Sequence, residues 1–275
     1  MSSAPASPEP TSYYEKNPAA AARYDALHAS QTDDLAFYVE EAVRSGGPIL
    51  EVGCGTGRIA LSIARAGIDV VGLDRSSSML AVAAASRRGA DPAAGRRLAL
   101  VRADMRAFAF RRSFARVLLP FRVFQSMLIV PDQLAALAAC RAALAPEGRL
   151  VFNVFDPRYD LLAAGGSPIE MTETGREYQD GQAEVVEKWT GWYDPVLQLL
   201  HGTFIYERRD SVGVVVERAF EPLVLRYFFR YEIEHLLARA GYEVEALYGG
   251  WEREPYDEHG EEMIWIARPA EFHQA

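Results

Sequence analysis

The segment 49–57 has the sequence ILEVGCGTG, in which an acidic residue is followed by three glycines at alternating positions. The apolar residues before Gly53 predict a buried strand, and the residues after Gly57 predict the start of a helix. Glycines in such a turn let the backbone bend sharply and let a ligand approach closely, while the first turn of the helix offers unpaired N–H groups. The pattern therefore predicts a binding site for a small, polar and partly anionic ligand.

Two further acidic residues end apolar runs later in the chain. Asp74 follows the run at 70–73, and Asp104 follows the run at 98–101. At the carboxyl ends of neighbouring parallel strands, Asp74 can accept both hydroxyls of a ribose, and Asp104 can accept the amino group of adenine. The alternative is that each acid caps a helix. Acids at the ends of three successive strands favour the nucleoside interpretation.

The glycine spacing and Glu51 narrow the class of nucleotide. Dinucleotide-binding turns use G-x-G-x-x-G, whereas this chain has G-x-G-x-G. A carboxylate two residues before Gly53 would repel a pyrophosphate but would tolerate a ligand that carries an ammonium group. The sequence therefore disfavours NAD and favours a nucleoside joined to an amino acid.

The elements that position these residues alternate from residue 48 onward. Strands are predicted at 49–52, 70–73, 98–101, 117–121 and 150–155, and helices at 56–66, 76–87 and 132–144. Continuous apolar strands that alternate with helices are typical of a parallel sheet covered on both faces. We expect an α/β fold with a doubly wound sheet.

Beyond Asp156 the pattern changes. Antiparallel strands are predicted at 185–190, 199–208, 212–218 and 223–229, then a helix at 231–240 and a closing hairpin at 244–248 and 263–267. The expected organisation is a disordered tail over 1–12, two helices within 13–47, a sheet core over 48–156, a β insertion over 157–229 and the rest of the core over 230–275.

Composition argues against several classes of protein. The chain has 275 residues, 49% of them hydrophobic, and a net charge of −9, which on average repels nucleic acid and anionic membranes. No run approaches the about 20 apolar residues of a membrane span, and residues 1–12 lack the apolar core of a secretory signal. We therefore expect a cytoplasmic protein. Cys54 and Cys140 offer neither a disulfide framework nor a metal site, and Cys54 is best interpreted as a packing residue.

The motifs EVGCGTG at 51–57, GLD at 72–74 and ADM at 103–105 resemble those of class I S-adenosylmethionine-dependent methyltransferases, of the small-molecule type. The resemblance covers about 48–155 and implies a Rossmann-like, seven-stranded, mostly parallel sheet whose last strand is antiparallel. It implies S-adenosylmethionine as methyl donor and S-adenosylhomocysteine as product. The candidate cofactor-binding residues are Tyr24, Glu51, Gly53, Cys54, Gly55, Thr56, Gly57, Arg58, Asp74, Arg75, Met79, Ala103, Asp104, Met105 and Phe121.

Residues 119–122, with sequence LPFR, follow the fourth predicted strand, where the family places groups beside the transferred methyl. Families that methylate an amide or adenine nitrogen often carry an Asn/Asp-Pro-Pro-Tyr-type motif there. Its absence argues against DNA or glutamine N-methylation.

The segment 24–28 resembles the N-terminal helix that small-molecule methyltransferases fold over the cofactor, which implies that 13–47 forms a lid. Arg23 or Arg58 could then meet the methionine carboxylate. An ordinary exposed amphipathic helix is the alternative. The aromatic-rich insertion is expected to cover the substrate site, with His201 as a possible base and Arg226 as a carboxylate clamp, unless both are surface residues.

The predicted function is methyl transfer to a nitrogen or oxygen of a small molecule, mainly through alignment and exclusion of water. Candidate catalytic residues are Tyr24, His28 and His201, and candidate substrate-binding residues are Tyr14, Phe124, Trp189 and Arg226. We expect no metal, nucleic acid or membrane partner; monomer and homodimer stay open, as does the acceptor. The alternatives are a tRNA or protein methyltransferase and a non-catalytic cofactor-binding protein.

Overall fold

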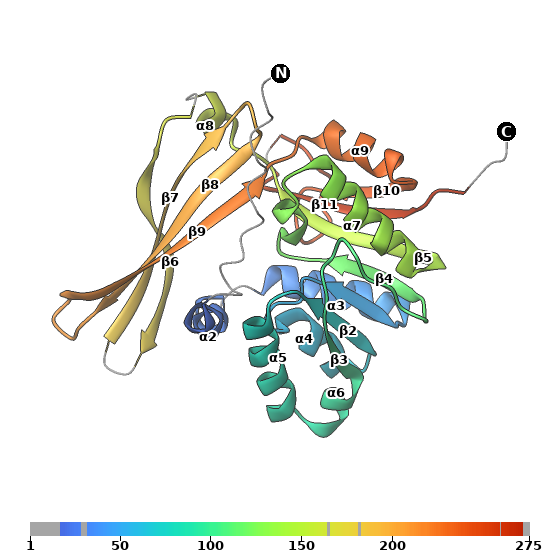
Figure 1. Ribbon diagram of the computed structural model, residues 1–275, viewed down its shortest axis with the longest axis horizontal. Coiled ribbons are helices and arrows are strands. Elements are labelled where there is room, and N and C mark those ends of the chain that lie inside the picture. Colours follow the sequence, from blue (N-terminus) through green and yellow to red (C-terminus); the bar gives the residue numbers. More distant parts are fainter. Residues whose placement is uncertain (1–16, 29–31, 164–165, 181–182, 259, 272–275) are drawn as a thin grey trace, which may run out of the picture.

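The computed structural model describes residues 17–28, 32–163, 166–180, 183–258 and 260–271. They form a seven-stranded sheet with helices on both faces and a separate four-stranded sheet beside it (Figure 1). In chain order, the strands of the larger sheet are β1 (Ile49–Val52), β2 (Val70–Asp74), β3 (Leu98–Arg102), β4 (Phe114–Leu119), β5 (Leu144–Phe155), β10 (Tyr242–Tyr248) and β11 (Glu262–Pro269).

The strand order of the larger sheet is β10-β11-β5-β4-β1-β2-β3. β1 pairs in parallel with β2 and β4, whereas β11 is antiparallel to both of its neighbours, β5 and β10. The predicted doubly wound sheet with an antiparallel last strand is confirmed. The fourth strand lies at 114–119 rather than at 117–121, because the strand ends before Pro120, which has no N–H to donate.

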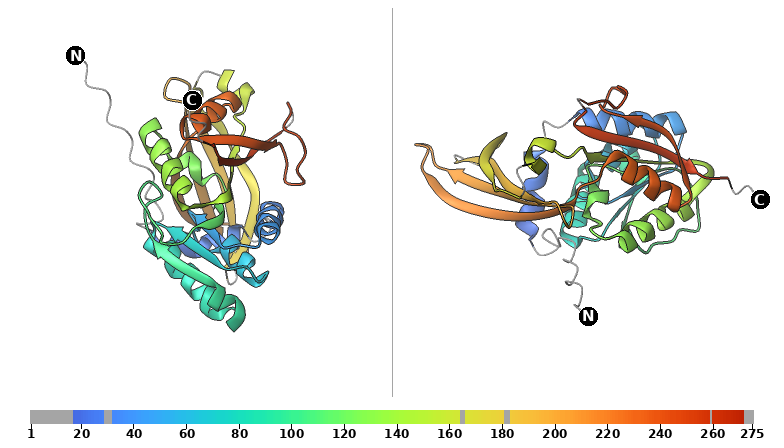
Figure 2. Two further views of the ribbon diagram at one scale, coloured as in Figure 1. Left: turned by 90° about the vertical axis from the view of Figure 1, so that its right-hand side faces the viewer. Right: turned by 90° about the horizontal axis from the view of Figure 1, so that it is seen from above.

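Helices cover both faces of this sheet (Figure 2). Their bounds are α2 (Pro18–Leu27), α3 (Asp33–Ser45), α4 (Arg58–Arg65), α5 (Ser77–Gly89), α6 (Pro92–Arg97), α7 (Val130–Ala143) and α9 (Arg230–Arg239). α7 and α9 pack in one apolar cluster and α3 and α4 in another on the opposite face. Local signals set the helix starts: the Asn17 side chain accepts a hydrogen bond from the N–H of Ala20, and Ser76 caps α5.

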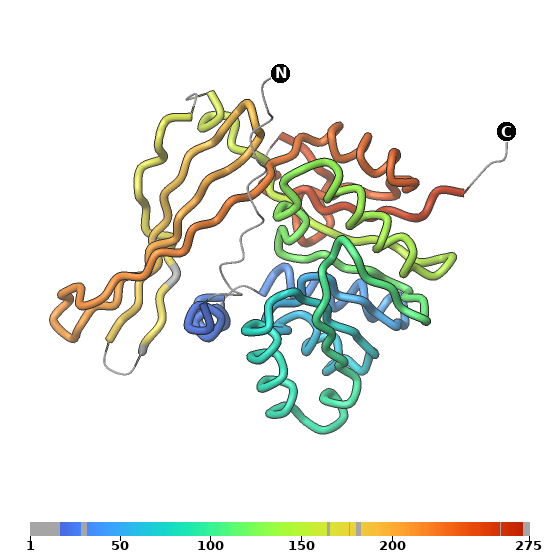
Figure 3. Tube along the Cα trace, viewed as in Figure 1, coloured from blue at the N-terminus to red at the C-terminus, as the bar shows by residue number. Residues whose placement is uncertain are grey.

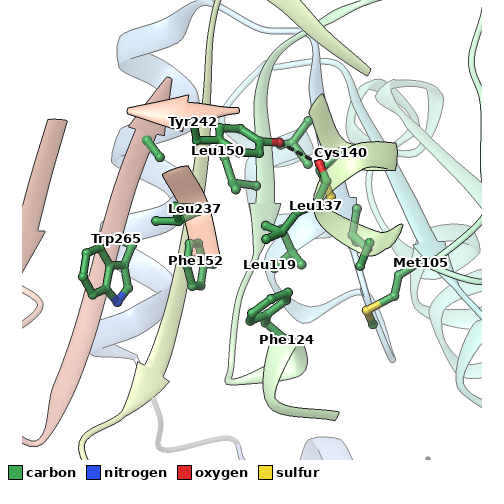
Figure 4. Close-up of a cluster of buried hydrophobic side chains, with 14 of the residues drawn as sticks. Met105, Leu119, Phe124, Leu137, Cys140, Leu150, Phe152, Leu237, Tyr242 and Trp265 are labelled. Carbon is green, nitrogen blue, oxygen red and sulfur yellow. Dashed lines mark hydrogen bonds between the residues drawn. The ribbon is translucent and has the colours of Figure 1, made fainter. Parts of the chain in front are cut away.

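The cluster beneath α7 and α9 fixes the position of the sheet (Figure 4). Phe152 on β5 stacks on Trp265 of β11, with 6.4 Å between ring centroids. The buried Tyr242 hydroxyl donates a hydrogen bond to the carbonyl oxygen of Leu137 at 3.0 Å. Full burial of one such side chain contributes about 1.5–3 kcal/mol, so the strand ends near this cluster are held firmly.

The smaller sheet, which we call the insertion sheet, contains β6 (Ile169–Asp180), β7 (Ala183–Asp194), β8 (Leu199–Arg209) and β9 (Val215–Arg226) in that order. The sequence predicted two strands, at 212–218 and 223–229, where the structure has the single strand β9, because Pro222 is accommodated at the edge of the sheet. Strand β6, helix α6 and helix α8 (Tyr159–Ala163) were not predicted. Strand β6 is rich in polar residues and lacks a clear apolar alternation.

The path of the chain explains how the two sheets meet (Figure 3). The chain leaves the larger sheet after β5, builds the insertion sheet and returns directly to α9. Helix α2 contacts both α5 and β6, so it lies between the two sheets (Figure 1). None of the helices within the described ranges combines the length and the apolar content that a membrane span requires.

Candidate functional site

A cavity of about 310 Å³ lies where the carboxyl ends of β1, β2 and β4 face α2 and the insertion sheet. Open α/β sheets bind ligands at this edge. The lining residues that the sequence had singled out are Tyr24, His28, Gly53, Gly55, Asp74, Arg75, Met79, Ala103, Asp104, Met105 and Phe121. The structure therefore brings together residues from the N-terminal helix, the glycine turn and the ends of three strands.

The glycine turn borders the cavity with backbone alone. Gly53 has a φ of +76°, and a Cβ added there would lie 2.3 Å from the Cγ2 of Val123. Gly55 has a φ of +53°, and a Cβ there would meet no atom within 4 Å. Only glycine adopts these conformations readily, and at Gly55 the missing side chain leaves open space beside the cavity. The turn can therefore admit a ligand against its backbone.

Asp74 at the end of β2 is held by two backbone donors. The N–H of Gly55 donates to Oδ2 and the N–H of Ser76 donates to Oδ1, both at 2.8 Å. Burial raises the pKa of this carboxyl, and the two hydrogen bonds oppose the rise. A carboxylate has about four lone-pair sites, so capacity is left for hydroxyl donors of a ligand.

Asp104 at the end of β3 pairs with Arg106. The Nε of Arg106 donates to Oδ1 at 3.0 Å and Nη2 donates to Oδ2 at 2.7 Å. The guanidinium lowers the pKa of Asp104, which keeps its carboxylate charged. Arg106 also donates to Asp132 at 3.0 Å, which fixes the pair in place. A charged acceptor thus stands at the edge of the cavity beside Met105.

Three rings form one wall of the cavity. Tyr24 and His28, at the end of α2, stack with 4.2 Å between centroids, and Phe121 after β4 meets His28 edge-on at 5.2 Å. Phe121 and Arg122 both have left-handed backbone conformations, with φ of 55° and 64°. Such strain costs about 1–3 kcal/mol per residue and gathers at functional sites. The strained turn presents Phe121 to α2.

The insertion sheet supplies side chains that the sequence analysis did not select. Glu187 on β7, Phe204 and Tyr206 on β8, and Glu221 on β9 all line the cavity. The two glutamates are only 1% and 5% exposed. Acidic residues inside apolar strands were a signal in the sequence, but the face on which they lie depends on strand register. The cavity is therefore lined both by the motif residues and by polar side chains from strands that come much later in the chain.

Glu51 does not line the cavity. Residues of a strand alternate between faces, so Glu51 points away from Leu50 and Val52 and toward α4, where it accepts a hydrogen bond from the N–H of Ala60. Burial raises its pKa to about 8. The argument that its charge repels a pyrophosphate is therefore not supported by the geometry, because burial disfavours the charged carboxylate and the side chain faces the other side of the sheet.

The other turn residues support the site from outside the cavity. Thr56 donates a hydrogen bond to Asp25 and so ties the glycine turn to α2. Arg58 is not among the lining residues: its guanidinium pairs with Asp34 of α3 in a bidentate contact and lies 5.5 Å from the centroid of the Phe121 ring. Cys54 and Gly57 lie outside the cavity lining, and Cys54 is buried. Tyr14 falls outside the described residues.

His201 lies outside the cavity. It sits directly opposite Trp192 on β7, and the two rings stack at 4.3 Å. Alternation along β8 places Tyr206 and Phe204 on the inner face, toward the cavity, and His201 on the outer face. His201 is therefore not positioned to act as a base on a ligand in the cavity.

Three further candidates serve packing instead of lining the cavity. Phe124 is buried in the main core and stacks on Phe228 at 5.7 Å. Trp189 packs in the cluster between the insertion sheet and β5. Arg226 donates to the side-chain oxygen of Gln198 at 2.8 Å and pairs with Glu232. The sequence identified these side chains by type, but their orientation was set by register and packing.

Comparison with known proteins agrees with this geometry. Residues 49–148 match a family described as a methyltransferase domain. A cypemycin N-terminal methyltransferase from a Streptomyces species is 26% identical over 221 residues, 80% of this chain and 82% of that protein. The CcbJ methyltransferase of Streptomyces caelestis has a TM-score of 0.77 at 22% identity, over 96% of this chain and 100% of that chain.

A third similar protein is CalS10, an amino pentose methyltransferase from Micromonospora echinaspora whose structure contains S-adenosylmethionine. Its TM-score is 0.68 at 23% identity, over 90% of this chain and 95% of that chain. The matched domain, the shared fold and the cavity at the carboxyl ends of the strands agree with one another. Residues 49–148 are therefore similar to a methyltransferase domain, and the chain shares the fold of these methyltransferases.

Proposed function

We propose that this chain transfers a methyl group from S-adenosylmethionine to a nucleophilic atom of a small molecule held between the larger sheet and the insertion sheet. The observation that carries the proposal is that one cavity is lined both by the glycine turn and strand-end acids and by the insertion sheet. Donor and acceptor can therefore occupy the same enclosed space, which methyl transfer requires.

The residues on the larger sheet fit the donor. Gly55 leaves open space beside the turn for the methionine part, Asp74 is placed to accept the ribose hydroxyls, and Asp104 to accept the adenine amino group. When bound, S-adenosylmethionine supplies a methyl group on a positively charged sulfur. Phe121 and Tyr24 offer ring faces, which attract a cation by about 0.5–2 kcal/mol without reacting with it.

Helix α2 and the insertion sheet fit the roles of lid and cover. α2 contacts both α5 and β6, and Thr56 holds it to the glycine turn through Asp25. A closed site excludes water and aligns the acceptor with the methyl group, which are the main requirements of this displacement. Helix α2 therefore acts as a lid over the core, and the insertion sheet covers the acceptor. Helix α3, which the sequence analysis included in the lid, instead packs with α4 in the apolar cluster on one face of the larger sheet.

Two features support a small acceptor. The cavity of about 310 Å³ holds the donor as well, which leaves room for a small acceptor or for one group of a larger one. The net charge of −9 disfavours a nucleic-acid acceptor. Among the relatives, one is named as an N-terminal methyltransferase and another as an amino pentose methyltransferase. Both names place an amino group on the acceptor of that relative.

The test is turnover with a methyl-labelled donor against a panel of small amines, alcohols and sugars, with tRNA and a protein extract as rival acceptors. We expect label in one or more small molecules and none in the macromolecules. Salt-dependent labelling of tRNA, or cofactor binding with no transfer to any acceptor, would contradict the proposal.

A further inference from the structure

The inner face of the insertion sheet brings two acids to the acceptor side of the cavity. Glu187 on β7 is directly opposite Tyr206 on β8, and Phe204, two residues before Tyr206, is directly opposite Glu221 on β9. Strand alternation therefore places these four side chains on one face, and all four line the cavity. The two carboxyl groups flank the strand that carries Tyr206.

Both carboxyl groups are almost fully buried, with residue exposures of 1% and 5%. Removing a carboxylate from water is unfavourable unless polar or charged partners compensate. Glu187 accepts a hydrogen bond from the Thr174 hydroxyl at 2.8 Å, and the Tyr206 hydroxyl bonds to Glu221. Arg23 of α2 adds a positive charge, with its guanidinium 5.1 Å from the centroid of the Tyr206 ring.

The charged residues that line the insertion side of the cavity are all acidic. The lining residues from the insertion sheet include two acids and no cation, whereas the larger sheet contributes both acids, Asp74 and Asp104, and cations, Arg75 and Arg122. Arg122 is itself paired with Glu262. The insertion side therefore offers a negative potential in a poorly hydrated space, which is complementary to a positively charged ligand.

We propose, on the basis of the methyl transfer proposed above, that the acceptor is an amine whose protonated nitrogen is recognised by Glu187 and Glu221. A protonated amine has two or three N–H donors and a full charge, so it can bond to carboxylates on both sides of Tyr206. An alcohol of the same shape has one donor and no charge. The pair therefore determines specificity for nitrogen over oxygen.

The same carboxyl groups provide the proton balance of the reaction. The bound ammonium gives one proton to a carboxylate of the pair, which leaves a lone pair on nitrogen. That lone pair forms the nitrogen–carbon bond as the carbon–sulfur bond of the donor breaks, and the electron pair of that bond stays on sulfur. The product is an N-methylammonium ion, and the proton passes from the carboxyl to water. His201, on the outer face, is not needed as a base.

The experiment compares matched probes and matched variants of the full chain saturated with S-adenosylhomocysteine. The probes are cyclohexylamine with cyclohexanol and glucosamine with glucose, and calorimetry measures their binding. The variants are Glu187→Gln, Glu221→Gln and the double substitution. Glu217→Gln is the control. Glu217 is an exposed glutamate four residues before Glu221 on the same face of β9, directly opposite Arg208.

We expect at least one amine to bind tenfold or more tightly than its alcohol. The double variant should reduce that preference at least tenfold, each single variant less, while affinity for S-adenosylhomocysteine changes less than twofold and Glu217→Gln behaves as wild type. Equal binding of amines and alcohols, no binding of either amine, or an unchanged preference in the double variant would overturn the proposal. If the double variant does not fold, the proposal is tested by the preference of the wild-type protein for the amine and by the loss of that preference in the single variants.

The controls separate this inference from the function on which it rests. If wild-type protein does not bind S-adenosylhomocysteine, the methyl-transfer proposal itself fails. If the cofactor product binds but amines are not preferred, only the amine assignment fails. A parallel loss of affinity for S-adenosylhomocysteine in Glu187→Gln or Glu221→Gln would show instead that the carboxylates contact the cofactor and not the acceptor, and would overturn the amine assignment.

Discussion

The two sides of the cavity are built in different ways. The side of the larger sheet depends on backbone geometry: two glycines of the turn have no side chains, and Asp74 is held by two backbone N–H groups. The insertion sheet contributes side chains on adjacent antiparallel strands, where each lining residue can change without altering the backbone. We therefore expect the glycine turn, which we assign to the donor, to tolerate few substitutions, and the face of the insertion sheet, which we assign to the acceptor, to accept substitutions that change specificity.

We expect the largest loss of cofactor affinity from a substitution in the glycine turn. In Gly53→Ala the new Cβ would lie 2.3 Å from Val123 Cγ2, at a φ of +76° that alanine rarely adopts. We expect affinity for S-adenosylmethionine to fall more than a hundredfold, and stability by about 1–3 kcal/mol. Calorimetry and thermal unfolding measure the two effects, and Gly67→Ala, also at positive φ but distant from the cavity lining, controls for the backbone strain. Equal effects in the two variants would contradict the role of the turn.

Asp74→Ala should have the next largest effect. It removes the carboxylate that accepts from Gly55 and Ser76 and that we assign to the ribose, so cofactor affinity should fall about ten- to a hundredfold. Asp91→Ala is a matched control, because Asp91 only caps α6. Unchanged cofactor affinity by calorimetry would remove Asp74 from the site.

Removal of residues 1–29 sharpens the comparison, because α2 touches both sides of the cavity. If this segment is a lid, turnover should fall about tenfold or more while cofactor affinity falls less, since the glycine turn and Asp74 remain. Steady-state kinetics and calorimetry on the same preparation give the two values. Equal turnover in the truncated and full chains would refute the lid.

Substitution of Glu51 should have the smallest effect on cofactor binding. Its pKa is raised to about 8, so the folded state binds a proton more tightly than the unfolded state, and stability should fall as pH rises from about 4.5 to 8. The slope is at most about 1.4 kcal/mol per pH unit. Glu51→Gln should flatten this slope in denaturant titrations while cofactor affinity changes less than twofold. An identical slope in wild type and variant would contradict the raised pKa.

Local patterns predicted most of the larger sheet and many of the residues by which it lines the cavity. The glycine turn, Asp74 and Asp104 follow short apolar strands, and their places at strand ends require only sequence-local rules. The same rules failed at Pro222, where an edge strand accommodates a residue that usually interrupts pairing. They also missed β6, whose polar residues have little local signal for a strand.

Which residues of the insertion sheet line the cavity depended on strand register, which no local pattern specified. A shift of one residue exchanges the two faces of a strand, and this decided that Tyr206 and Glu221 line the cavity while His201 stacks on Trp192 outside it. The same alternation turned Glu51 toward α4. Side-chain type alone had suggested that His201 and Glu51 belonged to the site.

The sequence by itself determined the fold class, and its motifs predicted the methyl donor, because both depend on contiguous residues whose backbone needs are specific. Only the tertiary structure decided which residues of the insertion sheet line the cavity. Glu187 and Glu221 are far apart in the chain and reach one cavity through the pairing of three strands, so their shared role follows from long-range register and from the docking of the insertion sheet against the core.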